Sequence, residues 1–390
     1  MGINIVAIAI LVIPVVQIVS YQVSTYLSWS RPTEKIPKNA SLRITPGSLP
    51  PDIYYIILDG YTRADILRDE FHDDNSPFIK RLSELGFYVA QCSQSNYAQT
   101  ELSLASSLNL NYLDALGERF VEGTNIKTDL WALNGKSIVR QMFTKLGYTI
   151  VAFETGYYWI QWEDADIFLS PGMNTLERWE IVGGFNGFEA MLVKTSAGVL
   201  ITDATGLSDR FMSDINYPNH RRRERTLFQL DMLKRLSSSV QGPKFIYAHL
   251  IIPHDPFIFG SQGEVVHREP GKNDEEYIVA YRDQVAYINQ RIMEVIEAIQ
   301  ADTDHPAVII LQGDHGTGRF SQRGRMAILN AYYLPEVSTG SLYDSISPVN
   351  TFRVVFNHYF GGDFPLLEDT SYYSAYGTPY QYEIVPNECR

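Results

Sequence analysis

The sequence predicts an α/β domain with a mostly parallel central sheet, preceded by an apolar N-terminal segment. Short runs of β-branched and aromatic residues alternate along the chain with longer segments that carry apolar residues at helical spacing. The strand-like runs are apolar on both faces, which is typical of parallel strands covered by helices on either side. With 390 residues, 45% of them hydrophobic, the chain is long enough to bury a large core.

Each element follows from a local pattern. Buried strands are expected at residues 52–58, 149–154, 244–251 and 307–311, with an extended segment at 87–92. Helices are expected at residues 76–85, 136–146, 220–237 and 275–299, and a polar turn favours a further helix over 100–108. Because ligands in such sheets bind beyond the carboxyl ends of the strands, the residues after each strand are the first functional candidates.

The first 29 residues differ from the rest of the chain. No charged residue occurs from Ile3 to Trp29, and about 20 apolar residues are enough for a transmembrane helix. A cleaved signal peptide is the alternative, but no basic residue precedes the apolar run and no small-residue cleavage motif is evident. The proline-rich stretch 30–50 predicts a linker, so the globular domain is expected over residues 51–390.

Charge and cysteine content exclude several classes of protein. The formal net charge of −13 argues against a nucleic-acid partner, because phosphate backbones are bound by clustered basic residues. Cys92 and Cys389 are too few for a disulfide-rich scaffold or a four-cysteine zinc site, and their separation leaves open whether they pair. The basic cluster at residues 221–225 is expected to be a solvated helix face.

Polar residues follow three of the predicted strands. Asp59 ends the first, His249 and His254 lie at the end of the strand at 244–251, and Asp314 and His315 follow the strand at 307–311. Carboxylates and imidazoles brought to one edge of a sheet can share a divalent cation. Taken singly, Asp59 is compatible with an ordinary turn and Asp314 with a helix N-cap. Their combination indicates a metal or phosphate site.

These motifs resemble the alkaline phosphatase and sulfatase superfamily. The resemblance is greatest to its membrane-anchored branch, which includes phosphoethanolamine transferases and lipoteichoic acid synthases. The matching stretches are Leu58–Gly60, Thr100–Ser106, Pro253–Pro256 and Gly313–Gly316, in family-like order within residues 51–335. The resemblance implies an alkaline phosphatase-like three-layer sandwich.

The resemblance also implies roles for single residues. Thr100 would be the nucleophile at a helix N-terminus, and Asp59, Asp314 and His315 would hold a divalent metal together with it. The metal would be Zn, Mn, Ca or Mg. His254, and with it His249, would contact the oxygens of the transferred group. From the residues alone, an N-cap or ST-turn is the favoured interpretation of Thr100, and Ser95 and Ser103 are rival nucleophiles.

The sequence also departs from relatives in this superfamily. Cys92 lacks the proline and arginine that accompany the formylglycine of type I sulfatases. The transferases carry a glutamate where this chain has Asp59, and a further histidine after the Asp-His-Gly motif. Residues 317–330 instead contain Arg319, Arg323 and Arg325. We expect these arginines, Arg319 first, to bind an anionic substrate; a solvated loop is the alternative.

The resulting expectation is a membrane-anchored, metal-dependent phospho- or sulfoester hydrolase or phosphoryl-group transferase. It would act on a cell-envelope lipid or glycan through a covalent Thr100 intermediate. The alternatives are a hydrolase without transfer and a degenerate, non-catalytic scaffold tethered to the membrane. The resemblance implies an extracytoplasmic domain, whereas Arg31, Lys35, Lys38 and Arg43 after the apolar segment favour a cytoplasmic flank.

Overall fold

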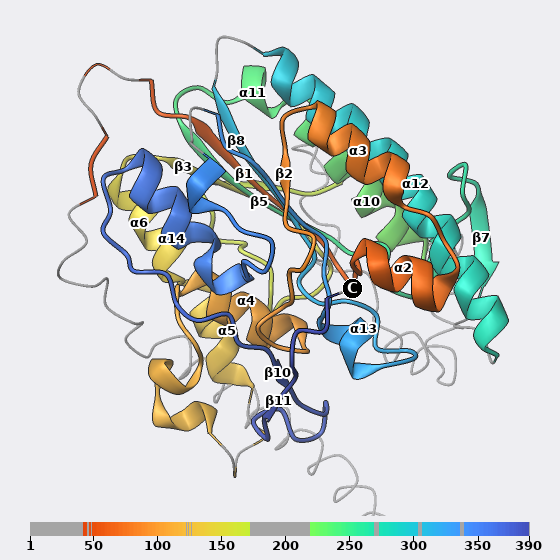
Figure 1. Cartoon of the computed structure of the whole chain (residues 1–390). Coiled ribbons are helices and arrows are strands. Elements are labelled where there is room, and N and C mark those ends of the chain that lie inside the picture. Colours follow the sequence, from red (N-terminus) through yellow and green to blue (C-terminus); the bar gives the residue numbers. More distant parts are fainter. Residues whose placement is uncertain are drawn as a thin grey trace, which may run out of the picture.

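The structure, a computed structural model, describes residues 42–44, 47, 49–121, 123, 125, 127–171, 219–268, 273–302, 306–335 and 339–389. These residues build a seven-stranded sheet with helices on both faces (Figure 1). The strands, in chain order, are β1 (Asp52–Leu58), β2 (Tyr88–Val89), β3 (Thr149–Phe153), β4 (Ile167–Leu169), β5 (Lys244–Leu250), β6 (Phe257–Phe259), β7 (Val265–Arg268), β8 (Ala307–Gln312), β9 (Asn330–Tyr333), β10 (Tyr372–Tyr373) and β11 (Glu383–Ile384).

The α-helices are α2 (Ala64–Phe71), α3 (Ser76–Glu84), α4 (Thr100–Leu108), α5 (Thr128–Gly135), α6 (Ile138–Lys145), α10 (His220–Leu233), α11 (Leu236–Ser239), α12 (Asp274–Ala301), α13 (Gln322–Met326) and α14 (Pro348–Tyr359). Helices α4, α6 and α14 cover one face of the sheet, and α2, α3, α10 and α12 cover the other (Figure 1). This arrangement of layers confirms the predicted α/β fold.

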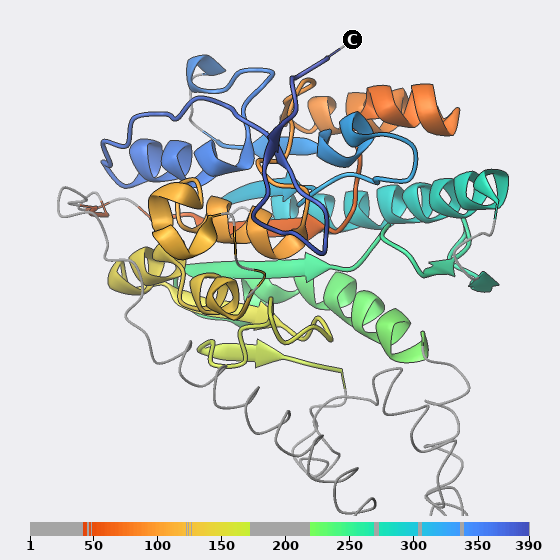
Figure 2. The same cartoon turned by 90° about the horizontal axis from the view of Figure 1, so that it is seen from below.

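The strand order across the large sheet is β2-β9-β8-β1-β5-β3-β4. Strand β1 is parallel to β5 on one side and to β8 on the other, and β3 continues the parallel array beside β5. Only β9 runs antiparallel to its neighbours β8 and β2. In Figure 2 the arrows of β1 and β5 point the same way, so their carboxyl ends meet at one edge of the sheet.

Strand β1 is buried on both faces because its side chains alternate between two cores. Tyr54, Ile56 and Leu58 pack in the core shared with α10 and α12. The intervening side chains, Ile53, Tyr55 and Ile57, pack in the core shared with α6 and α14. A strand with two apolar faces is the pattern expected of a central parallel strand, and this central position delivers Asp59 to the middle of the sheet edge.

Several expectations can be compared directly with the structure. The predicted transmembrane helix at residues 1–29 lies outside the described residues. Among the helices that the structure does describe, none is long and apolar enough to cross a membrane. The helix expected over residues 220–237 is divided into α10 and α11. Cys92 and Cys389, whose pairing the sequence left open, form a disulfide with Cα atoms 5.3 Å apart.

Candidate active site

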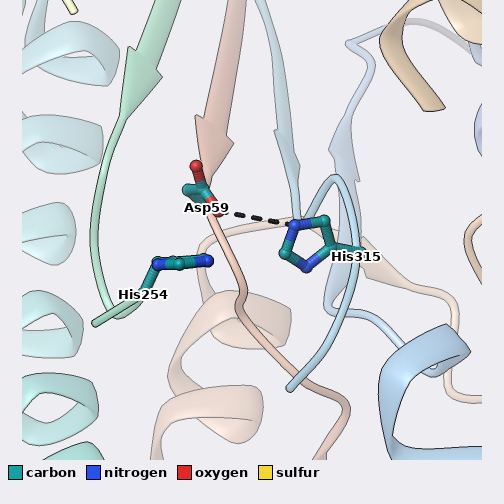
Figure 3. Close-up of side chains that lie close together, drawn as sticks. All are labelled: Asp59, His254 and His315. Atoms are coloured by element: carbon teal, nitrogen blue, oxygen red, sulfur yellow. Dashed lines mark ion pairs between the residues drawn. The ribbon is translucent and has the colours of Figure 1, made fainter. Parts of the chain in front are cut away.

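The candidate site lies where three neighbouring parallel strands end. Asp59 follows β1, His254 lies on the loop after β5, and His315 lies on the loop after β8 (Figure 3). Backbone hydrogen bonds join the first two loops, because His254 N donates to Asp59 O at 3.0 Å. Gly60 has φ +73, and a Cβ on it would lie 3.3 Å from the Cβ of His254. Glycine therefore suits both the turn after Asp59 and the close approach of the two loops.

The side chain of His315 is at the centre of the predicted ligand set. Its Nε2 atom lies 3.1 Å from Thr100 Oγ1, 3.7 Å from Asp59 Oδ1 and 3.5 Å from Asp314 Oδ2. Donors that share one tetrahedral ion with bonds of about 2.0–2.2 Å are themselves roughly 3–4 Å apart. The structure thus brings together all four residues that the sequence predicted as metal ligands.

The loop backbone orients the His315 ring. Nδ1 lies 2.9 Å from Gly316 O, which leaves Nε2 directed at Asp59 (Figure 3). Burial, followed by the nearby guanidinium of Arg325, lowers the pKa of His315 to about 4. The ring is therefore neutral at pH 7, and a neutral imidazole whose second nitrogen is held by a carbonyl is the usual form of a metal-binding histidine.

Asp59 is surrounded by imidazoles. His249 Nε2 lies 3.3 Å from Asp59 Oδ2, and both side chains are buried. Burial alone would raise the pKa of Asp59, but His254, with His249 and His315, outweighs burial and holds that pKa well below its usual range. In turn, burial favours the neutral ring of His254, but Asp59 and Asp255 outweigh it and raise the pKa of His254 to about 9. Asp59 is therefore held as an anion.

Several buried polar atoms at this edge have no hydrogen-bond partner. They are Asp59 Oδ1, Asp314 Oδ2 and both ring nitrogens of His249. The other oxygen of Asp314 accepts from Gly60 N at 3.1 Å, so the orphaned one is free to bind a ligand. A buried carboxylate oxygen without a donor is costly, and a divalent cation would remove that cost. The residues present therefore fit a bound metal ion.

Two overlapping sets of donors meet the distance requirement for such an ion. One contains Asp59, His254 and His315, and the other contains Asp59, His249 and Asp314; within each set the donor atoms lie within 4.8 Å of one another. Hence His249 and His254, predicted from the resemblance as substrate contacts, also lie within reach of a cation. Asp59 is common to both sets. Mixed carboxylate and imidazole donors suit zinc or manganese.

Thr100 is the first residue of α4 and is partly exposed, whereas the rest of that helix is buried. Ser95 and Ser103, the rival nucleophiles, are buried and both donate to the backbone carbonyl of Asp314, at 2.6 and 2.7 Å. Their hydroxyls thus hold the Asp314 loop against α4. The hydroxyl of Thr100, by contrast, contacts the ring of His315, a predicted metal ligand.

Arg222 is a residue whose role the sequence did not reveal. The cluster at residues 221–225 was expected to be solvated, but the Arg222 side chain is buried. Its guanidinium donates to the carbonyl oxygens of Ile251, His254 and Asp255 at 2.8–3.2 Å. Arg222 therefore fixes the loop that carries His254. Only the three-dimensional neighbourhood identifies it, because a run of arginines gives no sign of which one turns inward.

The three arginines after Asp314-His315-Gly316 have different surroundings. Arg319 pairs with Asp274 at 2.8 Å and stacks over the ring of Tyr277. Arg323 pairs with Asp65 at 2.5 Å. Arg325 instead donates from Nε to Ala98 O at 2.5 Å, close to Thr100. The substrate contact expected first of Arg319 stays a prediction.

Fold and site together define an α/β protein whose carboxylate and imidazole side chains, grouped at the carboxyl edge of a parallel sheet, could hold a metal ion. The family model described as Sulfatase matches residues 51–352. The chain belongs to the sulfatase family, within the alkaline phosphatase and sulfatase superfamily, and this membership supports a hydrolase or transferase. No curated protein sequence matches the chain at a significant level.

Solved structures share the fold. The C-terminal periplasmic domain of EcEptC from Escherichia coli, in complex with Zn, aligns with TM-score 0.54 and 13% identity over 90% of this chain and 96% of that one. The integral membrane lipooligosaccharide phosphoethanolamine transferase A from Neisseria meningitidis aligns with TM-score 0.52 and 12% identity, covering 87% of this chain and 60% of that one. At these identities the likeness concerns the fold.

Proposed function

We infer that this protein is a metal-dependent phospho- or sulfoester hydrolase, or a phosphoryl-group transferase, with Thr100 as the nucleophile. The observation that carries this proposal is the convergence on His315 Nε2 of a helix-terminal hydroxyl and two buried carboxylates. A structural cluster would satisfy its own acceptors, whereas oxygens of Asp59 and Asp314 here have no donor.

The proposed reaction has two displacement steps. Thr100 Oγ1 bonds to the phosphorus or sulfur atom while the bond from that atom to the ester oxygen breaks, and the proton lost by Thr100 is taken up, in net terms, by the leaving alcohol. Water or an acceptor hydroxyl then bonds to the phosphorus or sulfur atom, the bond from that atom to Thr100 Oγ1 breaks, and Thr100 regains the proton that the incoming oxygen gives up. Thr100 opens α4, so backbone N–H groups and the positive end of the helix favour the anionic group beside it.

A divalent cation held by Asp59, Thr100, Asp314 and His315 would stabilise the deprotonated hydroxyl, which is otherwise a weak nucleophile. His254 is the candidate for contact with the oxygens of the transferred group. Its Nδ1 is held at 2.8 Å by Asp255 Oδ1, and its ring lies 5.8 Å from that of His315. The remaining nitrogen therefore stays directed at the site. His249 is fully buried behind Asp59, and its contact with substrate stays a prediction.

The proposed substrate is an anionic ester of a cell-envelope lipid or glycan. The proposed location of the domain is extracytoplasmic, because the fold neighbours include a periplasmic domain and a membrane-embedded lipooligosaccharide phosphoethanolamine transferase. The Cys92–Cys389 disulfide supports this location, since disulfides persist in oxidising compartments. Membrane anchoring through residues 1–29 belongs to the same proposal.

Turnover of phosphomonoester, phosphodiester and sulfate ester substrates, each with zinc, manganese, calcium and magnesium, tests the function. Thr100→Ala should reduce kcat/KM by about 10³-fold or more, because it removes the nucleophile. Thr100→Ser keeps a hydroxyl and should retain activity within about tenfold of wild type. Mass spectrometry of quenched wild-type enzyme should find the phospho- or sulfo-group on Thr100. Full turnover by Thr100→Ala would exclude Thr100 as the nucleophile.

A non-catalytic, membrane-tethered member of the family is the second candidate. Two sequence departures favour it, namely Asp59 in place of a glutamate and the missing histidine after Gly316. Metal content separates the two candidates. A purified protein that binds no metal at the Asp59 site and turns over none of these esters would be the non-catalytic form.

A further inference from the structure

The side chain of Arg325 spans the two loops that carry the proposed nucleophile and its metal ligand. Nε donates to the carbonyl of Ala98 at 2.5 Å, two residues before Thr100, and Nη1 donates to the carbonyl of Gly316 at 3.4 Å, next to His315. The methylene Cδ is confined as well, because a Cβ on Gly318 would approach it to 3.1 Å. The guanidinium is therefore held in a fixed place beside the site.

The charge of Arg325 acts on the ligand set. Burial lowers the pKa of Arg325, while Asp314 and Asp59 oppose that change. An arginine stays protonated in proteins even so. After burial itself, Arg325 is also the strongest influence that lowers the pKa of His315. A fixed positive charge thus lies beside the loop that carries His315 and beside the residues that lead into Thr100.

Arg325 differs from Arg222 and Arg319 because one of its guanidinium nitrogens makes no hydrogen bond within the described residues. The guanidinium of Arg222 donates to loop carbonyls, and that of Arg319 pairs with the carboxylate of Asp274. Within the described part of the chain, Arg325 forms no salt bridge, and its Nη2 atom has no hydrogen-bond partner. It is partly exposed. A guanidinium with a free donor is suited to oxyanions, because its planar fork matches phosphate and sulfate oxygens.

We propose that Arg325 binds the non-bridging oxygens of the phospho- or sulfo-group while Thr100 attacks it. This inference rests on the proposed function. It also accounts for how a chain of net charge −13 attracts an anionic ester to two carboxylates, since local fixed charge outweighs net charge inside a site.

The test measures anion binding separately from turnover. Isothermal titration calorimetry gives the dissociation constant of inorganic phosphate for the metal-loaded protein. Arg325→Met should weaken phosphate binding by about 10- to 100-fold, the loss expected for charge-assisted hydrogen bonds. Arg325→Lys should recover only part of that loss, because lysine lacks the planar fork. Guanidinium ion added to Arg325→Ala should restore a measurable fraction of turnover.

Arg140→Met is the matched control. Arg140 is also partly buried and donates to a carbonyl, Gly135 O, and to Asp164, but it lies on α6; its loss should leave phosphate binding unchanged. Metal content of every variant is measured alongside. Phosphate affinity equal to wild type in Arg325→Met, with no rescue by guanidinium, overturns the role of Arg325 alone. Wild-type protein that binds no phosphate overturns the proposed function as well.

Discussion

Asp314 uses its two carboxylate oxygens differently, and this difference gives a prediction for one side chain. Oδ1 accepts from Gly60 N, while Oδ2 has no described donor and faces His315. Asp314→Asn keeps the shape and the first contact but removes the charge. We expect metal affinity to fall about 100-fold or more, since loss of an outer partner alone typically costs 10- to 100-fold.

Elemental analysis after dialysis, together with competition against a chelator, measures that loss. His358→Ala is the control, because His358 is exposed at the end of α14, where Phe360 O accepts from Arg43 N in the segment that precedes β1. Unchanged metal stoichiometry in Asp314→Asn would remove Asp314 from the ligand set.

At this scale the sequence predicts residues that follow an apolar strand and misses Arg222, whose burial depends on a distant loop. Asp59 and Asp314 follow apolar strands directly, so the strand pattern alone places them at one edge. Arg222 is different, because it is buried only where the loop after β5 presents carbonyls that need donors. Those carbonyls belong to residues about 30 positions away in the sequence. The pattern of residues in α10 therefore does not indicate that Arg222 is buried.

Between elements, a group of buried charges joins α2 to α13. Asp65 accepts from Arg63 Nε at 2.7 Å and also pairs with Arg323 of α13. Burial would raise the pKa of Asp65, but Arg63 and Arg323 outweigh it, and the pKa is lowered. The carboxylate therefore adds stability at every pH above its ordinary pKa of about 4, and this contribution is lost as the pH falls through the lower, folded-state value.

Asp65→Asn should reduce the free energy of unfolding by about 3 kcal/mol at pH 7, because it removes the buried carboxylate that pairs with both Arg63 and Arg323. The difference from wild type should shrink below about pH 4. Urea unfolding between pH 7 and pH 3 measures it. Asp231→Asn, in the exposed pair with Arg235, should cost less than about 1 kcal/mol. A pH-independent difference would contradict the charge-based account.

The elements that the sequence predicts well are those with one strong pattern. The central strands β1, β5 and β8 are continuous apolar runs, and α12 repeats apolar residues over 28 positions. By contrast, α5 is buried on every side, so it has no polar face to mark a helix. Strand β4 has only 3 residues, all half-buried. Neither has a local signal, because both depend on the elements that cover them.

The disulfide between Cys92 and Cys389 links two positions that are 297 residues apart in sequence, so it covalently joins the first part of the described chain to its C-terminal segment. The C-terminal segment also contacts the residue before Thr100, because Gln99 Nε2 donates to Ser374 Oγ at 3.1 Å and to Ala375 O at 3.1 Å. Reduction should lower the free energy of unfolding by about 2–4 kcal/mol, measured by urea unfolding with and without dithiothreitol. The Cys92→Ser/Cys389→Ser double variant should show the lower stability and no response to the reductant. A response in that variant would point to a different cause.

The proposed ligands come from β1, α4 and the loop after β8, at positions 59, 100, 314 and 315. These positions are far apart in the sequence and meet only where β1, α4 and β8 come together in the fold, so an unfolded chain has no comparable cluster of donors. Cation binding and folding are consequently coupled equilibria. A free cation concentration 100 times its dissociation constant should add about 2.7 kcal/mol to the stability of the native state. Thermal unfolding titrated with zinc or manganese therefore reports the affinity of this site without any substrate.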